Sequence, residues 1–274
     1  MNIEYVQKFI SENHEKIEGW FFGLDQVAFY DLFVMQNSLG ISGDICEVGV
    51  YKGKSLTFLS LLKAPQERIF GFDLFESDHQ DLAVENIEKF GDKAGISLVK
   101  GPTSNIDQTE LDAMISSPLR FLHIDAGHEY HEVLEQLYLF CPYVSDQGII
   151  AMDDYQDREF PGIEAAVLDY SEHDRPRRFV PFLAGGNKMY MCASPIATLL
   201  QGRLLEHANL KDRCRLTRVR DFNILVMGSK LPISSEQIKL QLGAFKFPHR
   251  GDHHLSLNEK SSRYAQISFG SGSG

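Results

Sequence analysis

The feature that most constrains the fold is a regular alternation of short apolar runs with amphipathic stretches, which begins near residue 44. The apolar runs include DICEVGV, RIFGFDLF, ISLVKG, LRFLHIDAG and GIIAMDDY. Helix-like segments of roughly ten to fifteen residues separate them, and this spacing is typical of βαβ units. We therefore predict an α/β fold with helices on both faces of a mostly parallel sheet.

The last two apolar runs, RRFVPFL and KMYMCAS, have only AGGN between them. That spacer is too short for a crossover helix, so the two runs are predicted to form an antiparallel hairpin at the sheet edge. Farther along, ATLLQGRLLEH resembles a helix, TRVRDFNILVMG a single strand, and SSEQIKLQL either one.

Ahead of the sheet, residues 3–16 and 24–38 have helical patterns and are joined across EGWFFG. One face of the second helix is predicted to carry Leu24, Ala28, Leu32 and Met35. These helices are expected to cover one end of the sheet, with Trp20, Phe21 and Phe22 as candidates for a lid over a site there.

Composition and charge exclude several classes of protein. With 43% hydrophobic and 24% charged residues, the chain can bury a core. It lacks the ~20 apolar residues of a membrane helix and a secretory signal, so a cytoplasmic location is expected. The cysteines form no CxxC pair, which argues against structural zinc and against disulfides.

Charge also divides the chain. Residues 1–200 hold 15 Lys and Arg against 32 Asp and Glu, whereas residues 201–274 hold 12 against 6. The acidic body would repel a phosphate backbone, so a nucleic-acid substrate is disfavoured. The basic tail is expected to lie on its own body or on a partner subunit.

Ligands of open parallel sheets bind beyond the carboxyl ends of the strands. The first strand ends in EVGVYKGKS, where Gly49 and Gly53 permit a tight turn and Ser55 stands where a helix begins and could cap it. The segment matches neither a dinucleotide loop nor a P-loop, and a plain strand-to-helix turn remains the alternative.

The second strand ends in Asp73, 26 residues beyond Glu47. A carboxylate there can accept both hydroxyls of a ribose, although a helix cap is an equal alternative. The third strand leads to Thr103 and Ser104, a small polar turn that could lie beside an adenine edge.

The fourth and fifth strands end in Asp125 and in the pair Asp153 and Asp154. Neighbouring strand ends lie about 5 Å apart, so the three carboxylates should converge. Convergent carboxylates repel unless a cation lies among them, and oxygen ligands suit Mg²⁺ or a related hard ion. In the alternative, Asp153 caps a helix and Asp154 points to solvent.

His128 follows Asp125 by three residues and is a candidate base, because a histidine near a metal can accept the proton of a substrate hydroxyl. Substrate binding or helix capping is the alternative. His123 lies within the strand and is expected to face the core or a helix, and His131 to be a surface residue.

Taken in order, IEGWF, EVGVYKGKS, GFDLFE, FLHIDAGHEYHEVLEQL, GIIAMDDY and FPGIEAAVLDY resemble the class I S-adenosylmethionine-dependent methyltransferases, specifically the sugar O-methyltransferases of the macrocin and mycinamicin type. The resemblance covers about residues 15–195. It implies a Rossmann-like sheet of seven strands whose last strand is antiparallel.

The resemblance also implies roles for single residues. The implied cofactor-binding residues are Glu47, Gly49, Gly53, Ser55, Asp73, Thr103, Ser104 and Asp125, of which Glu47, Gly49 and Gly53 line the methionine part. Asp125, Asp153 and Asp154 match metal ligands, and His128 matches the base of some members. Other members carry an aspartate where this chain has Gly127, so no base can stand there.

The predicted function is methyl transfer to a hydroxyl of a sugar or other small natural-product scaffold, with S-adenosylmethionine and Mg²⁺ or another hard divalent cation. The predicted organisation is a helical cap over 1–40, a cofactor-binding core over 41–195 and a basic extension of unknown role over 196–274. A homo-oligomer is possible, and no nucleic-acid or membrane partner is expected. The alternatives are an N-methyltransferase and a non-catalytic cofactor-binding or assembly subunit that docks through the basic tail.

Overall fold

The computed structural model describes residues 1–173, 178–206 and 214–228. These residues build one sheet with the strand order β3-β2-β1-β4-β5-β7-β6-β9-β8. The strands are β1 Asp44–Val48, β2 Ile69–Asp73, β3 Ile96–Lys100, β4 Leu119–Ile124, β5 Val144–Met152, β6 Phe179–Gly185, β7 Lys188–Ala193, β8 Cys214–Val219 and β9 Phe222–Met227. The segment SSEQIKLQL lies outside the described residues.

The strands from β3 through β5 pair in parallel, and β7 pairs antiparallel with both β5 and β6. The predicted mostly parallel α/β sheet with its antiparallel hairpin is therefore confirmed, but the hairpin does not lie at the edge of the sheet, because β9 pairs with β6. The described part of the chain has nine strands in the sheet, however, and the expected count of seven is wrong.

The two additional strands come from the segment that was predicted to be one strand. The chain turns at Arg220 and Asp221, with Arg220 at φ +49°, and β8 and β9 pair as an antiparallel hairpin. Leu225 of β9 also pairs in parallel with Leu183 of β6. This pairing covers the edge of β6, and β9 buries Phe222 there against the sheet.

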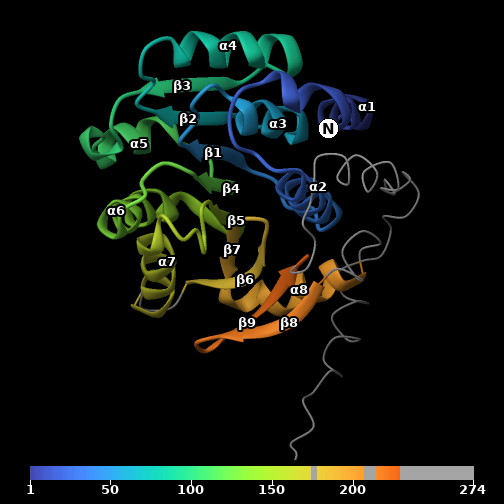
Figure 1. Cartoon of the computed structure of the whole chain (residues 1–274), viewed down its shortest axis with the longest axis vertical. Coiled ribbons are helices and arrows are strands. Elements are labelled where there is room, and N and C mark those ends of the chain that lie inside the picture. Colours follow the sequence, from blue (N-terminus) through green and yellow to red (C-terminus); the bar gives the residue numbers. More distant parts are fainter. Residues whose placement is uncertain (174–177, 207–213, 229–274) are drawn as a thin grey trace, which may run out of the picture.

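Helices cover both faces of the sheet, as predicted (Figure 1). One face packs against α1 Ile3–Lys8, α2 Gly23–Ser38, α3 Lys54–Leu62, α4 His79–Phe90 and α8 Ala197–Glu206, and the other against α5 Gln108–Met114, α6 Tyr130–Phe140 and α7 Pro161–His173. Alternation along the strands explains the two cores. In β4, Phe121 joins the first core and Leu122 the second, because successive side chains of a strand point to opposite faces.

The N-terminal helical predictions are confirmed with changes in detail. The first segment continues from α1 into a π-helical turn at Phe9–Asn13 and a 3-10 turn at His14–Lys16. The second segment is α2, but the predicted apolar face is too narrow, because residues 25–36 are all buried, including Asp25 and Asp31. Among the described helices, none combines the length and apolar character needed to cross a membrane.

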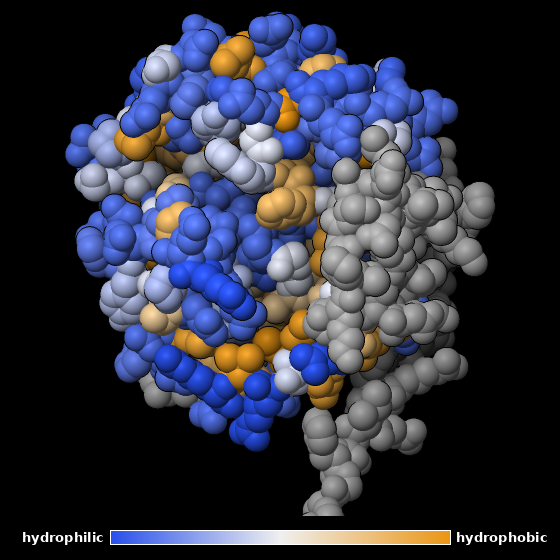
Figure 2. Space-filling model, viewed as in Figure 1, coloured by the Kyte–Doolittle hydropathy of each residue, from blue (hydrophilic) through white to orange (hydrophobic). Residues whose placement is uncertain are grey.

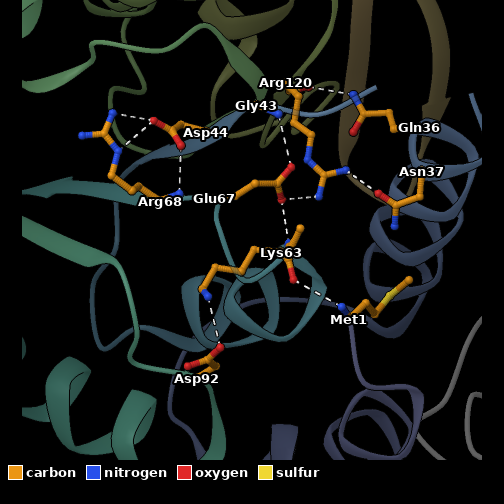
Figure 3. Close-up of polar contacts among 11 residues, drawn as sticks. Met1, Gln36, Asn37, Gly43, Asp44, Lys63, Glu67, Arg68, Asp92 and Arg120 are labelled. Atoms are coloured by element: carbon orange, nitrogen blue, oxygen red, sulfur yellow. Dashed lines mark hydrogen bonds and ion pairs between the residues drawn. The ribbon is translucent and has the colours of Figure 1, made fainter. Parts of the chain in front are cut away.

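Ion pairs lie at the end of the sheet where the parallel strands begin, called here the amino-terminal edge (Figure 3). Arg120, fully buried in β4, binds Glu67 at 2.6 Å and Asn37 at 2.9 Å. Glu67 also accepts backbone hydrogen bonds from Gly43 and Ala64. Hydrophilic residues dominate the face of the described residues seen in Figure 2, with smaller hydrophobic patches between them.

Candidate active site

The candidate site lies at the opposite edge, where the parallel strands end. The backbone amide of Gly49 donates to Phe72, that of Asp125 to Val48, and that of Asp153 to Ile124, at 2.7–2.9 Å. The ladder thus continues one residue beyond the strands. These bonds hold the loops after β1, β4 and β5 side by side, as the sequence predicts for a parallel sheet.

Two cavities open at this edge and share the wall residues Gly49, Tyr51, Asp73 and Asp125. The first has a volume of about 500 Å³ and lies beyond β1, β2 and β3, and the second has about 520 Å³ and lies beyond β1, β4 and β5. A ligand in the first cavity would therefore meet a ligand in the second along a common boundary.

The first cavity collects most of the predicted cofactor-binding residues, namely Gly49, Asp73, Thr103, Ser104 and Asp125. Glu47 and Gly53 line neither of these two cavities, and Ser55 lines only the second. Ser55 also does not cap α3: the N-cap is Gly53, at φ +81°, which has no side chain to bond to the helix amides. The loop needs a left-handed residue at the cap, and glycine adopts that conformation without strain.

Asp73 anchors the first cavity. Its Oδ2 atom accepts hydrogen bonds from the backbone amides of Val50 and Tyr51, each at 2.7 Å, and Oδ1 accepts one from Phe75 at 2.5 Å. The carboxylate therefore connects the end of β2 to the loop after β1. The two amides occupy both lone pairs of Oδ2, so Oδ1 keeps one lone pair that can accept a hydroxyl hydrogen.

Gly49 allows this loop to pass close to the next strand. It has φ +93°, and a Cβ atom there would lie 1.7 Å from the carbonyl oxygen of Asp125. No other residue fits without displacing backbone, because the obstruction is a carbonyl group and not a flexible side chain. The two cavities are close neighbours as a result.

The second cavity collects the predicted metal ligands Asp125, Asp153 and Asp154 together with His128. Asp125 and Asp153 belong with His123 to a group whose candidate ligand atoms lie within 4.8 Å of one another, and Asp154 does not belong to that group. The structure thus brings two of the three aspartates into close contact and places the third on the same cavity wall.

A buried lysine faces this cluster. Lys188, the first residue of β7, is 1% exposed and forms an ion pair with Oδ2 of Asp153. Burial alone would raise the pKa of Asp153, but the positive charges of Lys188 and His123 hold it below its usual range. Burial and the charge of Asp153 raise the pKa of Asp125 instead. Asp125, Asp153, Lys188 and His123 therefore affect one another's protonation.

His123 faces the core, as predicted, and Glu47 lies beside it. Both are fully buried, and Nδ1 of His123 lies 2.7 Å from Oε1 of Glu47. Burial and the charge of Lys188 would lower the pKa of His123, but hydrogen bonds with Asp153 and Glu47 outweigh them and raise it to about 9. Glu47 therefore contacts a core histidine and does not line the first cavity, where the resemblance implies that it meets the cofactor. A strand residue must face one side of the sheet or the other, and Glu47 faces the side of His123.

Asp154 and His128 form a second polar pair. Asp154, at φ +52°, accepts a 3.0 Å hydrogen bond from Asn187, and its Oδ2 atom lies 3.3 Å from Nε2 of His128. The imidazole stacks on Phe160 with a centroid distance of 4.0 Å and an interplanar angle of 12°. The imidazole of His128 is therefore oriented by the Asp154 carboxylate and by the Phe160 ring. Neither Asp153 nor Asp154 caps a helix, so that alternative for the two aspartates is wrong.

Sequence reasoning missed Asp25, Asn187 and Lys188. Asp25 lies in α2, and its two buried carboxylate oxygens have no hydrogen-bond partner among the described residues. Burial raises its pKa to about 7. A signal for Lys188 was present, since a lysine opens the otherwise apolar strand KMYMCA right after the AGGN turn. The sequence does not show that this turn reaches the ends of β4 and β5.

A comparison with protein families finds that residues 46–155 match the family described as a methyltransferase domain. That span runs from β1 to the residue pair after β5 and includes Asp73, Asp125 and Asp153. No curated protein matches the chain.

The chain is also similar to solved structures at low sequence identity. A putative O-methyltransferase from Klebsiella pneumoniae is 15% identical over 69% of this chain and 89% of that one, with a TM-score of 0.51. Cofactor-bound Rv0187 from MTB is 15% identical over 68% and 87%, with a TM-score of 0.50. MycE methyltransferase in complex with Mg and SAH is 17% identical over 69% and 53%, with a TM-score of 0.47.

The family match covers the strands that build the two cavities, and the strand order agrees with a Rossmann-like sheet. The comparisons thus identify a methyltransferase domain over residues 46–155, and the chain around it has a Rossmann-like fold.

Proposed function

We propose that this methyltransferase uses S-adenosylmethionine and a divalent metal ion to methylate a hydroxyl group of a sugar or another small natural-product scaffold. The observation that carries the proposal is the position of Asp125, which lines both cavities and lies against Asp153. Donor and acceptor would meet at this residue. The proposed organisation remains a cap over 1–40, a core over 41–195 and an extension over 196–274.

The first cavity suits S-adenosylmethionine. Asp73 would accept a ribose hydroxyl through Oδ1, Thr103 and Ser104 would border the adenosine, and Gly49 would let the methionine part approach the backbone. Tyr51 and Asp125 stand where this cavity meets the second one. The methyl group would point across that boundary.

The donor set of the second cavity fits a hard divalent cation. Asp125, Asp153 and Asp154 offer carboxylate oxygens, which are the ligands that Mg²⁺ prefers. Burial and the charge of Asp153 raise the pKa of Asp125, and a bound cation would oppose both effects. Such an ion would lower the pKa of a bound acceptor hydroxyl and hold its oxygen in place.

The protein's own task is to align the acceptor and remove one proton. The acceptor oxygen attacks the methyl carbon as the carbon–sulfur bond breaks toward sulfur, so the products are the methyl ether and S-adenosylhomocysteine. With an Nε2 hydrogen directed at Asp154, His128 has its lone pair on Nδ1, which accepts the hydroxyl proton. The nearby carboxylate then stabilises the imidazolium.

Cofactor binding is tested by calorimetry with S-adenosylmethionine and S-adenosylhomocysteine. We expect Asp73→Ala to weaken the affinity at least tenfold, about 1.4 kcal/mol, because it removes a charged hydrogen-bond acceptor. Asp78→Ala is the matched control, since Asp78 is exposed and makes no side-chain bond to the following helix. If the unmodified protein binds neither compound, the cofactor assignment is wrong.

Metal dependence is tested by S-adenosylhomocysteine release with a panel of hydroxyl and amine acceptors, with and without EDTA. We expect EDTA and Asp154→Asn each to reduce turnover on hydroxyl acceptors by about 10²-fold or more. Asp157→Asn is the control, because Asp157 lines the same cavity outside the aspartate set. Full activity in EDTA, or methylation of amines alone, would reject the metal or the hydroxyl assignment, and the latter result would favour an N-methyltransferase.

A further inference from the structure

Two consecutive residues at the β6–β7 turn, Asn187 and Lys188, contact two consecutive aspartates after β5. Asn187 donates a 3.0 Å hydrogen bond to Oδ1 of Asp154, and Lys188 forms its ion pair with Oδ2 of Asp153. The backbone amide of Tyr155 donates to the carbonyl of Asn187 at 2.7 Å. The turn is therefore joined to the loop after β5 by side chains and by backbone.

The conformation of the turn leaves Lys188 little freedom. Gly186 has φ +65°, and a Cβ atom there would lie 2.0 Å from Oδ1 of Asp25. The turn can approach α2 this closely only with glycine at that position. The Lys188 ammonium lies 5.9 Å from the centre of the Phe21 ring, and its side chain is 1% exposed. Its charge cannot move into solvent without opening this packing.

Both oxygens of Asp153 already have partners within the protein. Oδ1 accepts the backbone amide of Asp154 at 2.8 Å. Oδ2 pairs with Lys188 and lies 3.7 Å from Nε2 of His123. Asp125 and Asp154, by contrast, face the second cavity without a lysine or arginine partner among the described residues. One proposed metal ligand thus differs from the other two in its surroundings.

We propose that Lys188 is a built-in counter-cation that competes with the divalent ion for Asp153 and so weakens metal binding. This inference rests on the proposed metal dependence and identifies a residue that adjusts it. An ion bound beside Asp125 and Asp153 would meet the repulsion of the fixed Lys188 ammonium that pairs with Asp153. Lys188 is a positioning residue, since it acts on the ion through Asp153.

The test is Mn²⁺ binding measured from the free-ion signal in electron paramagnetic resonance, which needs no acceptor and no turnover. We expect Lys188→Met to lower the dissociation constant for Mn²⁺ at least tenfold, because the variant removes a like charge from the site. Lys188→Arg, which keeps the charge, should resemble the unmodified protein. Lys188→Gln supplies a neutral polar variant in case the methionine variant does not fold.

Lys63→Met is the matched control. Lys63 is also 1% exposed and paired with an aspartate, Asp92 at 3.0 Å, but it lies outside both cavities. Its loss should leave Mn²⁺ binding unchanged. Equal or weaker binding by both neutral variants at position 188, with normal affinity for S-adenosylhomocysteine, would overturn the proposal.

Failure of the proposed function gives a different result. If the unmodified protein is fully active in EDTA and binds no Mn²⁺, while Lys188→Met binds it, the metal requirement is wrong and the role of Lys188 stands. If neither protein binds Mn²⁺, both inferences are wrong.

Discussion

The two edges of the same sheet differ in how their buried charged side chains are paired. At the amino-terminal edge, Arg120 and Glu67 form an ion pair. The guanidinium also donates a hydrogen bond to Asn37, and the carboxylate accepts hydrogen bonds from two backbone amides. Nε of Arg120 is the one atom of this pair without a hydrogen-bond partner among the described residues. At the carboxyl-terminal edge, carboxylates outnumber cations and two cavities open beside them.

The difference shows which edge is built for stability and which for binding. Arg120 and Glu67 balance each other, and their geometry requires no ligand. At the other edge, burial acts on the pKa values of Asp25, Asp125, Asp153 and His123, and the charges and hydrogen bonds of their neighbours add to or oppose it. Excess negative charge beside a cavity is electrostatically complementary to a cation.

The largest effect is expected at the amino-terminal edge. Arg120→Met should lower the free energy of unfolding by about 3–5 kcal/mol, because it leaves the Glu67 carboxylate buried without its partner. Urea denaturation measures this loss. The affinity for S-adenosylhomocysteine should stay unchanged, and a variant that loses affinity while keeping its stability would contradict the assignment of the two edges.

Asp25 predicts a pH dependence at the carboxyl-terminal edge. Its pKa is raised to about 7 in the folded protein and is about 3.9 in an unfolded chain, so the folded state retains a proton that the unfolded state releases. Asp25 therefore contributes least to stability at high pH, and stability should fall by up to about 1.4 kcal/mol per unit as pH rises from about 4 to about 7.

Asp25→Asn tests this prediction, because asparagine does not titrate. Urea denaturation at pH 5, 6, 7 and 8 should show the variant gaining stability relative to the unmodified protein up to about pH 7, with no further gain above it. A pH-independent difference would mean that Asp25 keeps an ordinary pKa.

The smallest effect is expected for Lys93→Met. Lys93 pairs with Glu88 at 2.9 Å, and the two side chains are 72% and 52% exposed. Exposed ion pairs contribute about 0–1 kcal/mol, so urea denaturation should show a change in that range. A loss as large as that of Arg120→Met would show that exposure does not distinguish the two pairs.

Most of the fold could be predicted from the chain's own pattern. The parallel strands, the hairpin across AGGN and both N-terminal helices follow from local spacing, and the structure confirms them. The count of strands did not follow, because the turn at Arg220 has no glycine or proline to signal it. The second hairpin depends on its long-range pairing with β6.

The candidate site was predictable to the extent that it depends on strand ends. Asp73, Asp125, Asp153 and Asp154 line the cavities because each directly follows or ends a parallel strand. Glu47 was also predicted to line the cofactor site. It is the last residue but one of β1, and its side chain points into the core beside His123.

The sequence by itself determined the α/β class and the edge of the sheet at which polar side chains gather, because strand alternation and strand ends are local properties. Only the tertiary structure decided how charge is distributed there. Asp25 comes from α2 and Lys188 from β7, and their distance from Asp153 depends on how a helix and an antiparallel hairpin pack beside β5. No spacing along the chain encodes that packing, so the counter-cation of the acidic cluster could be found only in three dimensions.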